Sequence, residues 1–297
     1  MTDTPIGFIG IGAMGKPMAI NIRKAALPLA VADPNETATG ILAQQGAEVA
    51  ANARAVADRS AVVHACLPSV AIAEAVAADA AEGAAIKCFI NHGTTGSAYS
   101  KATAAMLAAK GIQFLDAPIS GGVTGAEAGT LAIMCSGSEE AFEAAKPGLE
   151  AMSAQLTYLG GQPGAAQVMK LCNNMLFFCS FAATMETMTL GAKAGLDPEQ
   201  MLAIMNKATG RNFATESIVG PNILSRSFDF GGANYIIEKD MELWRQEAEA
   251  YEVPGYIGTL VRTLFRQMVA EQGKDGDLSQ LTLLMEQMAG TQIPKTR

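Results

Sequence analysis

The chain has 297 residues, of which 49% are hydrophobic and 17% are charged, and its formal net charge is −8. Lysine and arginine are scattered rather than clustered, so the pattern indicates no basic face and no nucleic-acid partner. A chain of this length and apolar content can bury a sizeable core, and two domains are expected.

Other sequence features argue against secreted, membrane-spanning and metal-binding proteins. The start, MTDTPIGFIG, has no basic segment followed by an apolar one, and the longest apolar run, residues 175–185, is short for a bilayer. We therefore expect a soluble, cytoplasmic protein with no membrane partner. The five cysteines form no C-x-x-C pair and are interpreted as reduced core thiols. His64 and His92 have no ligand-spaced partners, so no metal site is expected.

In chain order, short apolar runs that predict strands alternate with Ala-rich stretches that predict helices. The predicted strands are residues 6–12, 29–32, 61–68, 87–91, 112–118, 131–137 and 156–160. The predicted helices between them are residues 14–26, 36–45, 70–82, 97–110 and 138–152. This alternation predicts an α/β, Rossmann-like N-terminal domain with a doubly wound, mostly parallel sheet.

Strand patterns end near residue 160, and the rest of the chain predicts an all-α domain. The predicted helices are residues 163–194, 198–208, 234–251, 255–271 and 277–289. The segment GGQPG, residues 160–164, separates the two patterns. We therefore predict one domain over residues 1–162 and an all-helical domain over residues 163–297.

A glycine-rich turn follows the first predicted strand and precedes the first predicted helix. The residues that fit G-x-G-x-x-G are Gly10, Ile11, Gly12, Ala13, Met14 and Gly15. Such glycines allow a tight turn, close approach of the backbone to a pyrophosphate, and close packing of helix on strand. Asp33 ends the second predicted strand, where a carboxylate accepts hydrogen bonds from ribose hydroxyls and repels a 2′-phosphate. The pattern predicts a dinucleotide site that favours NAD over NADP; a purely structural turn and a solvated loop aspartate are the alternatives.

Four segments together resemble the β-hydroxyacid dehydrogenase family. They are GFIGIGAMGKPMAINI (7–22), DAPISGGVTGAEAGTLAIM (116–134), GAAQVMKLCNN (164–174) and KDMELW (239–244). Their order and spacing match over essentially the full chain. The resemblance implies an oxidoreductase that transfers a hydride between a nicotinamide cofactor and a small 3-hydroxy acid or its semialdehyde. Residues 1–162 are then the NAD-binding domain and residues 163–297 the substrate and dimerisation domain.

The segment PISGG offers a hydroxyl and open backbone at Ser120, Gly121 and Gly122, which suits a carboxylate. By itself it also reads as a turn between two strands. The resemblance implies that these three residues bind the carboxylate of the substrate.

The segment GAAQVMKLCNN places polar residues in an otherwise apolar predicted helix. Gln167, Lys170, Asn173 and Asn174 are spaced to converge on one helix face, where they require partners or water. A cleft between the domains is one solution, and a snorkelling surface lysine is the alternative. The resemblance implies that Lys170 is the catalytic general acid/base and that Asn174 holds the substrate or the lysine. An apolar environment favours the uncharged amine that a base requires.

The resemblance also assigns residues to the cofactor outside the glycine-rich turn. They are Leu67 and Pro68 after one strand, Thr94 in NHGTTG, and Lys239 in KDMELW. The plainer interpretations are a turn, a loop and a surface charge.

Some positions depart from the usual family pattern. Asn91 and Gly93 stand where aspartate and serine are usual, and Ala166 replaces a glycine before the lysine. Gly232 and Ala233 replace an aromatic residue, which predicts a roomier substrate pocket. Candidates to close that pocket or to meet a second anionic group are Phe213, Tyr235, Trp244 and Arg211.

Two rival functions remain open at this point: a 6-phosphogluconate-like oxidative decarboxylase, and a non-catalytic scaffold of the same fold. The helical domain is short for the first, and the presence of Lys170 argues against the second. The apolar stretch of residues 175–185 exceeds what one cleft-lining helix needs. It predicts packing across a subunit interface in a homodimer or homotetramer.

Overall fold

The computed structural model describes residues 4–294. By its internal contacts the chain divides into two compact units, residues 1–170 and 171–297. The division falls inside the long helix α8 (Ala165–Lys193), whereas the predicted boundary lies in the loop before this helix.

The first unit is built on one nine-stranded sheet. Its strands are β1 (Ile6–Ile9), β2 (Leu29–Ala32), β3 (Glu48–Val49), β4 (Val62–Ala65), β5 (Cys88–Asn91), β6 (Gln113–Asp116), β7 (Ile119–Ser120), β8 (Leu131–Gly137) and β9 (Ser153–Tyr158). Strands β3-β2-β1-β4-β5-β6 lie in this order and are all parallel. Strand β8 is antiparallel to β6 and β7, and β9 is parallel to β8. The predicted α/β fold with a mostly parallel sheet is confirmed.

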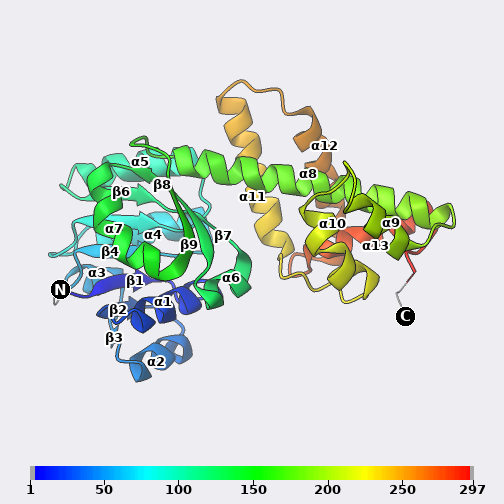
Figure 1. Ribbon diagram of the computed structural model, residues 1–297. Helices are drawn as coiled ribbons and strands as arrows, with labels where there is room; N and C mark the ends of the chain where they lie inside the picture. Colours follow the sequence, from blue (N-terminus) through cyan, green and yellow to red (C-terminus); the bar gives the residue numbers. More distant parts are fainter. Residues whose placement is uncertain (1–3, 295–297) are drawn as a thin grey trace. The chain divides into compact units, whose positions relative to one another are not determined.

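Helices cover both faces of this sheet (Figure 1). They are α1 (Gly15–Lys24), α2 (Glu36–Gln44), α3 (Ala53–Ala57), α4 (Val70–Ala80), α5 (Ser97–Ala108), α6 (Gly122–Ala128) and α7 (Glu139–Met152). One core, which includes Phe8 and Met18, lies beneath α1 and α7, and a second, which includes Phe89 and Leu107, lies beneath α3, α4 and α5. The sheet is therefore buried on both faces, as parallel sheets require.

The second unit is helical in the part that the structure describes. Beyond α8 it contains α9 (Pro198–Met205), α10 (Phe213–Ser217), the π-helix η1 (Val219–Leu224), α11 (Asn234–Ala250), α12 (Tyr256–Gln272), the 3-10 turn η2 (Leu278–Gln280) and α13 (Leu281–Ala289). Its core gathers apolar side chains around α8, among them Phe181, Met185 and Phe265.

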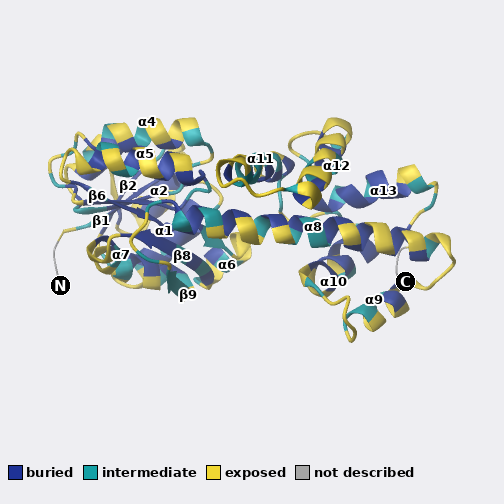
Figure 2. Cartoon of the chain, turned by 90° about the horizontal axis from the view of Figure 1, so that it is seen from above, coloured by how far each residue is buried: buried dark blue, intermediate teal, exposed yellow. Residues whose placement is uncertain are grey.

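Helix α8 is long and apolar enough to cross a membrane by length and composition, and half of its most apolar window is buried inside the protein. Buried and exposed residues alternate along it (Figure 2). Because Phe181 and Met185 are completely buried in the core of the second unit, we interpret α8 as a core helix.

The elements that the sequence pattern missed are short. They are β3, β7, α3, α6, α10 and η1, of two to seven residues each. Too few turns or alternations are present in such segments for periodicity to register. The five cysteines are free thiols, but Cys172 is exposed on α8 and so is not a core thiol as predicted.

Candidate functional site

The glycine-rich turn connects β1 to α1 and leaves one stretch of backbone open. A Cβ atom on Gly10, whose φ is +89°, would lie 2.3 Å from the carbonyl oxygen of Cys66. A Cβ on Gly15 would lie 1.8 Å from the carbonyl oxygen of Gly10, so both positions exclude a side chain. At Gly12, by contrast, a Cβ would meet nothing within 4 Å. A ligand can therefore approach the backbone at Gly12, next to the start of α1, where Met14 provides no side-chain cap.

Asp33 lies at the end of β2 and is bonded directly to this turn. Its Oδ2 accepts a hydrogen bond from the backbone N–H of Ile11 at 2.6 Å, and its Oδ1 accepts one from Asn35 at 2.7 Å. The side chain remains partly exposed. The carboxylate is thus fixed beside the open backbone of the turn.

The other predicted residues of the first unit follow the carboxyl ends of neighbouring parallel strands. Leu67 and Pro68 follow β4, Thr94 follows β5, and Ser120 follows β6. Since β1, β4, β5 and β6 are adjacent and parallel, these segments and the glycine-rich turn share one edge of the sheet. This edge is where doubly wound sheets bind ligands.

The segment PISGG forms a short strand and the start of a helix. Ser120 ends β7 and is half-buried, whereas Gly121 and Gly122 are exposed at the start of α6. A Cβ on Gly122 would meet nothing within 4 Å, so the backbone here is open. The interpretation of this segment as a simple turn between two strands is incomplete, because α6 intervenes before β8.

Lys170 is 8% exposed, and Gln167, one turn earlier on α8, is completely buried. This burial contradicts the interpretation of Lys170 as a snorkelling surface residue. The amide of Gln167 is bonded within the first unit, to the segment 93–96 and to Asp116. It therefore needs no solvent-filled cleft to satisfy it.

Asp116, at the end of β6, is completely buried. It accepts hydrogen bonds from Ser100 Oγ at 2.7 Å, the backbone N–H of Gly164 at 2.7 Å and Gln167 Nε2 at 3.0 Å. Burial raises the pKa of this carboxyl group to about 6, although the hydrogen bonds favour its charged form.

In the second unit, Asn174 and Lys239 are joined through one carboxylate. Asn174 Nδ2 donates to Asp240 Oδ2 at 2.8 Å, and Lys239 Nζ pairs with Asp240 Oδ1 at 2.7 Å. Asp240 is only 4% exposed. Asn173 is exposed and donates to Asn174 Oδ1 at 3.2 Å, so it does not belong to a buried polar face as predicted.

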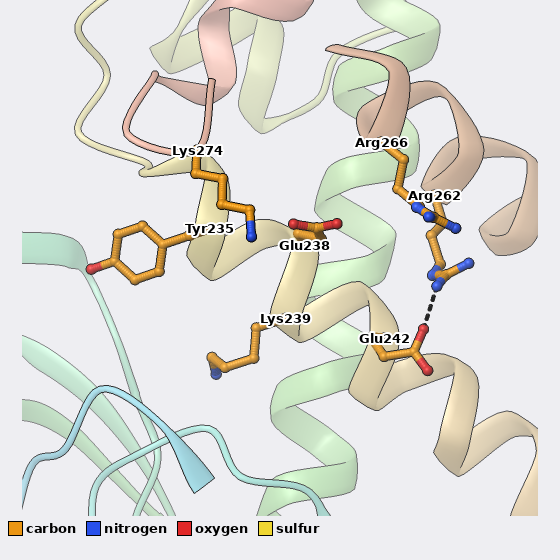
Figure 3. Close-up of a pocket in the computed structure, with 7 residues that line it drawn as sticks. All are labelled: Tyr235, Glu238, Lys239, Glu242, Arg262, Arg266 and Lys274. Atoms are coloured by element: carbon orange, nitrogen blue, oxygen red, sulfur yellow. Dashed lines mark hydrogen bonds and ion pairs between the residues drawn. The ribbon is translucent and has the colours of Figure 1, made fainter. Parts of the chain in front are cut away.

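A charged depression of about 430 Å³ lies beside Lys239 in the second unit. Figure 3 shows the side chains that line it, which come from α11, α12 and the loop before η2: Tyr235, Glu238, Lys239, Glu242, Arg262, Arg266 and Lys274. Arg262 pairs with Glu242, whereas Arg266 and Lys274 have no ion pair among the described residues. Four cationic side chains against two carboxylates, Glu238 and Glu242, make this depression a candidate for an anionic group.

The other candidates for the substrate pocket differ in their surroundings. Tyr235 lines the charged depression, Trp244 packs close to Gly258, and Phe213 contacts Phe177 edge-on. Arg211 is exposed and lies 3.6 Å from Glu216.

Known proteins resemble this chain over nearly its whole length. Residues 5–160 match the NAD-binding domain of 6-phosphogluconate dehydrogenase, and residues 164–285 match the NAD-binding domain of NADP-dependent 3-hydroxyisobutyrate dehydrogenase. The 2-(hydroxymethyl)glutarate dehydrogenase of Eubacterium barkeri is 34% identical, with 97% of each chain covered. The chain belongs to the β-hydroxyacid dehydrogenase family.

Two further members of this family are similar to the chain. The 3-hydroxyisobutyrate dehydrogenase of Pseudomonas aeruginosa is 35% identical over 89% of this chain and 91% of its own. The solved structure of the Mycobacterium tuberculosis 3-hydroxyisobutyrate dehydrogenase with L-serine has a TM-score of 0.86, at 29% identity over 96% and 99% of the chains. The chain is thus of the NAD(P)-dependent hydroxyacid dehydrogenase type.

The first unit fits the nicotinamide cofactor that this family uses. The open backbone at Gly12 and the start of α1 suit a pyrophosphate, and Asp33 lies where a ribose would follow. A nicotinamide ring, when bound, takes up or gives back a hydride.

Sequence reasoning missed four buried polar residues of this family member. Asp116 and Asp240 lie in the motif segments 116–134 and 239–244, but the sequence analysis assigned them no role. Their burial, which the sequence does not reveal, marks them as structurally important. His64 and His92, which are far apart in sequence, meet in the first unit, with His64 Nδ1 2.9 Å from His92 Nε2. Their positions at the ends of the adjacent strands β4 and β5 were the only available signal.

Proposed function

We propose that the protein is an NAD-dependent dehydrogenase of a small 3-hydroxy acid, or a reductase of its semialdehyde. The observation that carries this proposal is the buried Lys170 on α8, a helix whose first turn is bonded to the strand ends that carry the predicted cofactor and substrate segments. Burying an ammonium group costs free energy, so the low exposure of Lys170 favours a role beyond that of a surface charge.

Lys170 would be the general acid/base. In oxidation, its uncharged amine accepts the proton of the substrate hydroxyl as the hydride leaves the carbinol carbon. In reduction, its ammonium donates that proton to the carbonyl oxygen.

The carboxylate of the substrate would bind at Ser120, Gly121 and Gly122, where the backbone is open. Asn174 would present the second lone pair of its Oδ1 to the substrate or to Lys170, because Oδ1 accepts one bond from Asn173 and Nδ2 is committed to Asp240. The orientation of this amide supports a role as an acceptor.

The preference for NAD would come from Asp33. Its carboxylate is held beside the turn by the N–H of Ile11, where it would repel the 2′-phosphate of NADP. Residues 164–285 match a domain named for an NADP-dependent enzyme, and the comparison of NAD with NADP in the test below decides between the two cofactors.

The substrate would be a dicarboxylate rather than a monocarboxylate. The charged depression of the second unit carries four cationic and two carboxylate side chains, an excess of positive charge that suits a carboxylate. The related enzyme of Eubacterium barkeri is named for a dicarboxylic hydroxy acid, which agrees with this proposal.

The test is reduction of NAD, and separately of NADP, with 2-(hydroxymethyl)glutarate, 3-hydroxyisobutyrate and shorter 3-hydroxy acids, followed by the absorbance of the reduced nicotinamide. Turnover with NAD, and faster turnover of the dicarboxylate, is the expected result. Carbon dioxide release would instead support the decarboxylase, and tight NAD binding without any turnover would support the scaffold.

We also propose that the protein is cytoplasmic and forms a homodimer or homotetramer. Two leucines of α8 in the second unit, Leu176 and Leu190, are 72% and 71% exposed. Large apolar side chains exposed to this degree on a core helix favour burial against another subunit.

A further inference from the structure

Asp116 binds the start of α8 through two hydrogen bonds. Its Oδ2 accepts from the backbone N–H of Gly164 at 2.7 Å, just before the helix, and its Oδ1 accepts from Gln167 Nε2 at 3.0 Å. Ser100 Oγ also donates to Oδ1, at 2.7 Å. The free N–H groups at a helix start need acceptors, and here a carboxylate from β6 provides one.

The amide of Gln167 is held in one orientation. Its Nε2 donates to Asp116 Oδ1 and to the carbonyl oxygen of Gly93, both at 3.0 Å. Its Oε1 accepts from the backbone N–H groups of Thr95 at 2.9 Å and Gly96 at 3.3 Å. A flipped amide would face two donors with its NH₂ group and two acceptors with its oxygen, so only one orientation is satisfied.

These bonds connect three segments that carry candidate site residues. Gln167 and Lys170 are three residues apart and share a face of α8. Thr94 lies between Gly93 and Thr95, both of which Gln167 contacts. Asp116 directly precedes the segment that ends in Ser120.

Strand β8 also contributes a hydrogen bond to the start of α8. The backbone N–H of Ala166 donates to Ser136 Oγ at 2.9 Å, and Ser136 on β8 is paired with Asp116 on β6. The first turn of α8 is therefore fixed by side chains from two adjacent strands of the first unit.

We propose that Asp116 and Gln167 are positioning residues. They set the start and the rotation of α8, which places Lys170, and they hold the segment 93–96, which carries Thr94. Neither side chain reacts: Asp116 acts through Gly164 and Gln167, and Gln167 acts through the backbone of the segment 93–96. The expected loss of kcat rests on the proposed function, whereas the expected change in local structure does not.

The test exchanges donor and acceptor between the two side chains without changing their size. Asp116→Asn places an NH₂ group among donors, and Gln167→Glu places a second carboxylate against Asp116. In the double variant the NH₂ group of the new asparagine can donate to the new glutamate, which still accepts from Thr95 and Gly96. Each single variant should lose about 10- to 100-fold in kcat with a smaller change in the KM for substrate, and the double variant should recover part of the loss. Recovery is partial because the bond to Gly93 is not restored.

Gln113→Glu is the matched control. Gln113 lies on the same strand β6 and its Nε2 donates to the exposed Glu140, so the change also places two carboxylates together, but in solvent and away from α8. Its kcat should equal that of the wild type. If a single variant does not fold, Gln167→Met, which removes the bonds without adding charge, replaces it and should lower kcat in the same way.

Two measurements do not depend on turnover. Amide hydrogen exchange at Thr95, Gly96, Gly164 and Ala166 should be faster in the single variants and slower again in the double variant. Affinity for NAD, measured by calorimetry, should follow the same order because Thr94 lies in the affected segment. If the wild type binds NAD but oxidises no hydroxy acid, the proposed function fails, while these two measurements still decide the present proposal. Folded single variants with wild-type kcat, exchange and NAD affinity, or a double variant no better than the worse single one, would overturn it.

Discussion

Asp240 accepts a hydrogen bond from Asn174 Nδ2 at 2.8 Å through one carboxylate oxygen and pairs with Lys239 Nζ at 2.7 Å through the other. One buried carboxylate thus orients a candidate substrate residue and a candidate cofactor residue of the second unit. Asp240→Asn removes the negative charge that pairs with Lys239. We expect kcat/KM to fall by roughly tenfold or more, because a charge-assisted hydrogen bond contributes ~1.5–3 kcal/mol. Asp229→Asn, at an exposed position of the same unit, is the control.

Lys170→Ala should lower kcat by about 10²- to 10⁴-fold, the usual contribution of general acid/base catalysis. Lys170→Arg should be similarly impaired, because a guanidinium group does not release its proton near neutral pH. Steady-state kinetics on folded protein provides the measurement, and Lys207→Ala on an exposed lysine is the control. Normal turnover in folded Lys170→Ala would falsify the proposed function of this residue.

Asp33→Ser should shift cofactor use toward NADP. The change removes the negative charge that would oppose a 2′-phosphate, and it also removes the acceptor for the N–H of Ile11 at 2.6 Å. Activity with NAD should therefore fall as well, and the informative quantity is the ratio of kcat/KM for NAD to that for NADP. We expect this ratio to fall roughly tenfold, the effect of about 1.4 kcal/mol. An unchanged ratio would show that Asp33 has no part in cofactor choice.

The buried pair of His64 and His92 should make the protein sensitive to acid. Burial lowers the pKa of His92 from 6.5 to about 4 and lowers the pKa of His64 well below its usual value. The folded state therefore binds protons less readily than the unfolded state. This stabilising contribution is complete above pH 6.5 and is lost as the pH falls toward about 4, by about 3 kcal/mol for His92.

The measurement is the free energy of unfolding across this pH range for the wild type and His92→Asn. Asp116 acts in the opposite direction, because burial raises its pKa from 3.8 to about 6 and protonation then favours the folded state. The comparison between variants isolates the histidine effect, since both proteins keep Asp116. His92→Asn should have a flatter pH dependence, and parallel curves would contradict the assignment.

Leu176 and Leu190 are 72% and 71% exposed on α8, and we expect another subunit to cover them. Leu176→Lys with Leu190→Lys should shift the protein toward the monomer in sedimentation velocity, because an ammonium group is costly to bury in an apolar interface. Thr263→Lys, at an exposed position of α12 away from this face of α8, is the control. A wild-type protein that is monomeric at all concentrations would refute the interface.

Periodicity alone predicted the elements that matter most for the site. The strand ends after β1, β2, β4, β5 and β6 were located within a few residues, because buried parallel strands are continuous apolar runs. The glycine pattern located the turn before α1 because only glycine fits there: a Cβ at Gly15 would overlap the carbonyl of Gly10. The structure confirmed the fold class, and the similarity to known proteins confirmed the family that the four motif segments indicated.

The sequence did not predict which groups the buried polar side chains bind. Gln167 reads as a residue that needs water, yet the structure supplies four partners from segments 51 or more residues away. Asp116 and His64 read as ordinary strand residues, and only the packing of strands and helices brings each to its partners. Sequence by itself determined which local conformations and motifs this chain contains, since propensity and spacing are local properties. Tertiary structure alone decided which buried donor meets which acceptor, because those contacts depend on strand order and helix packing across long separations.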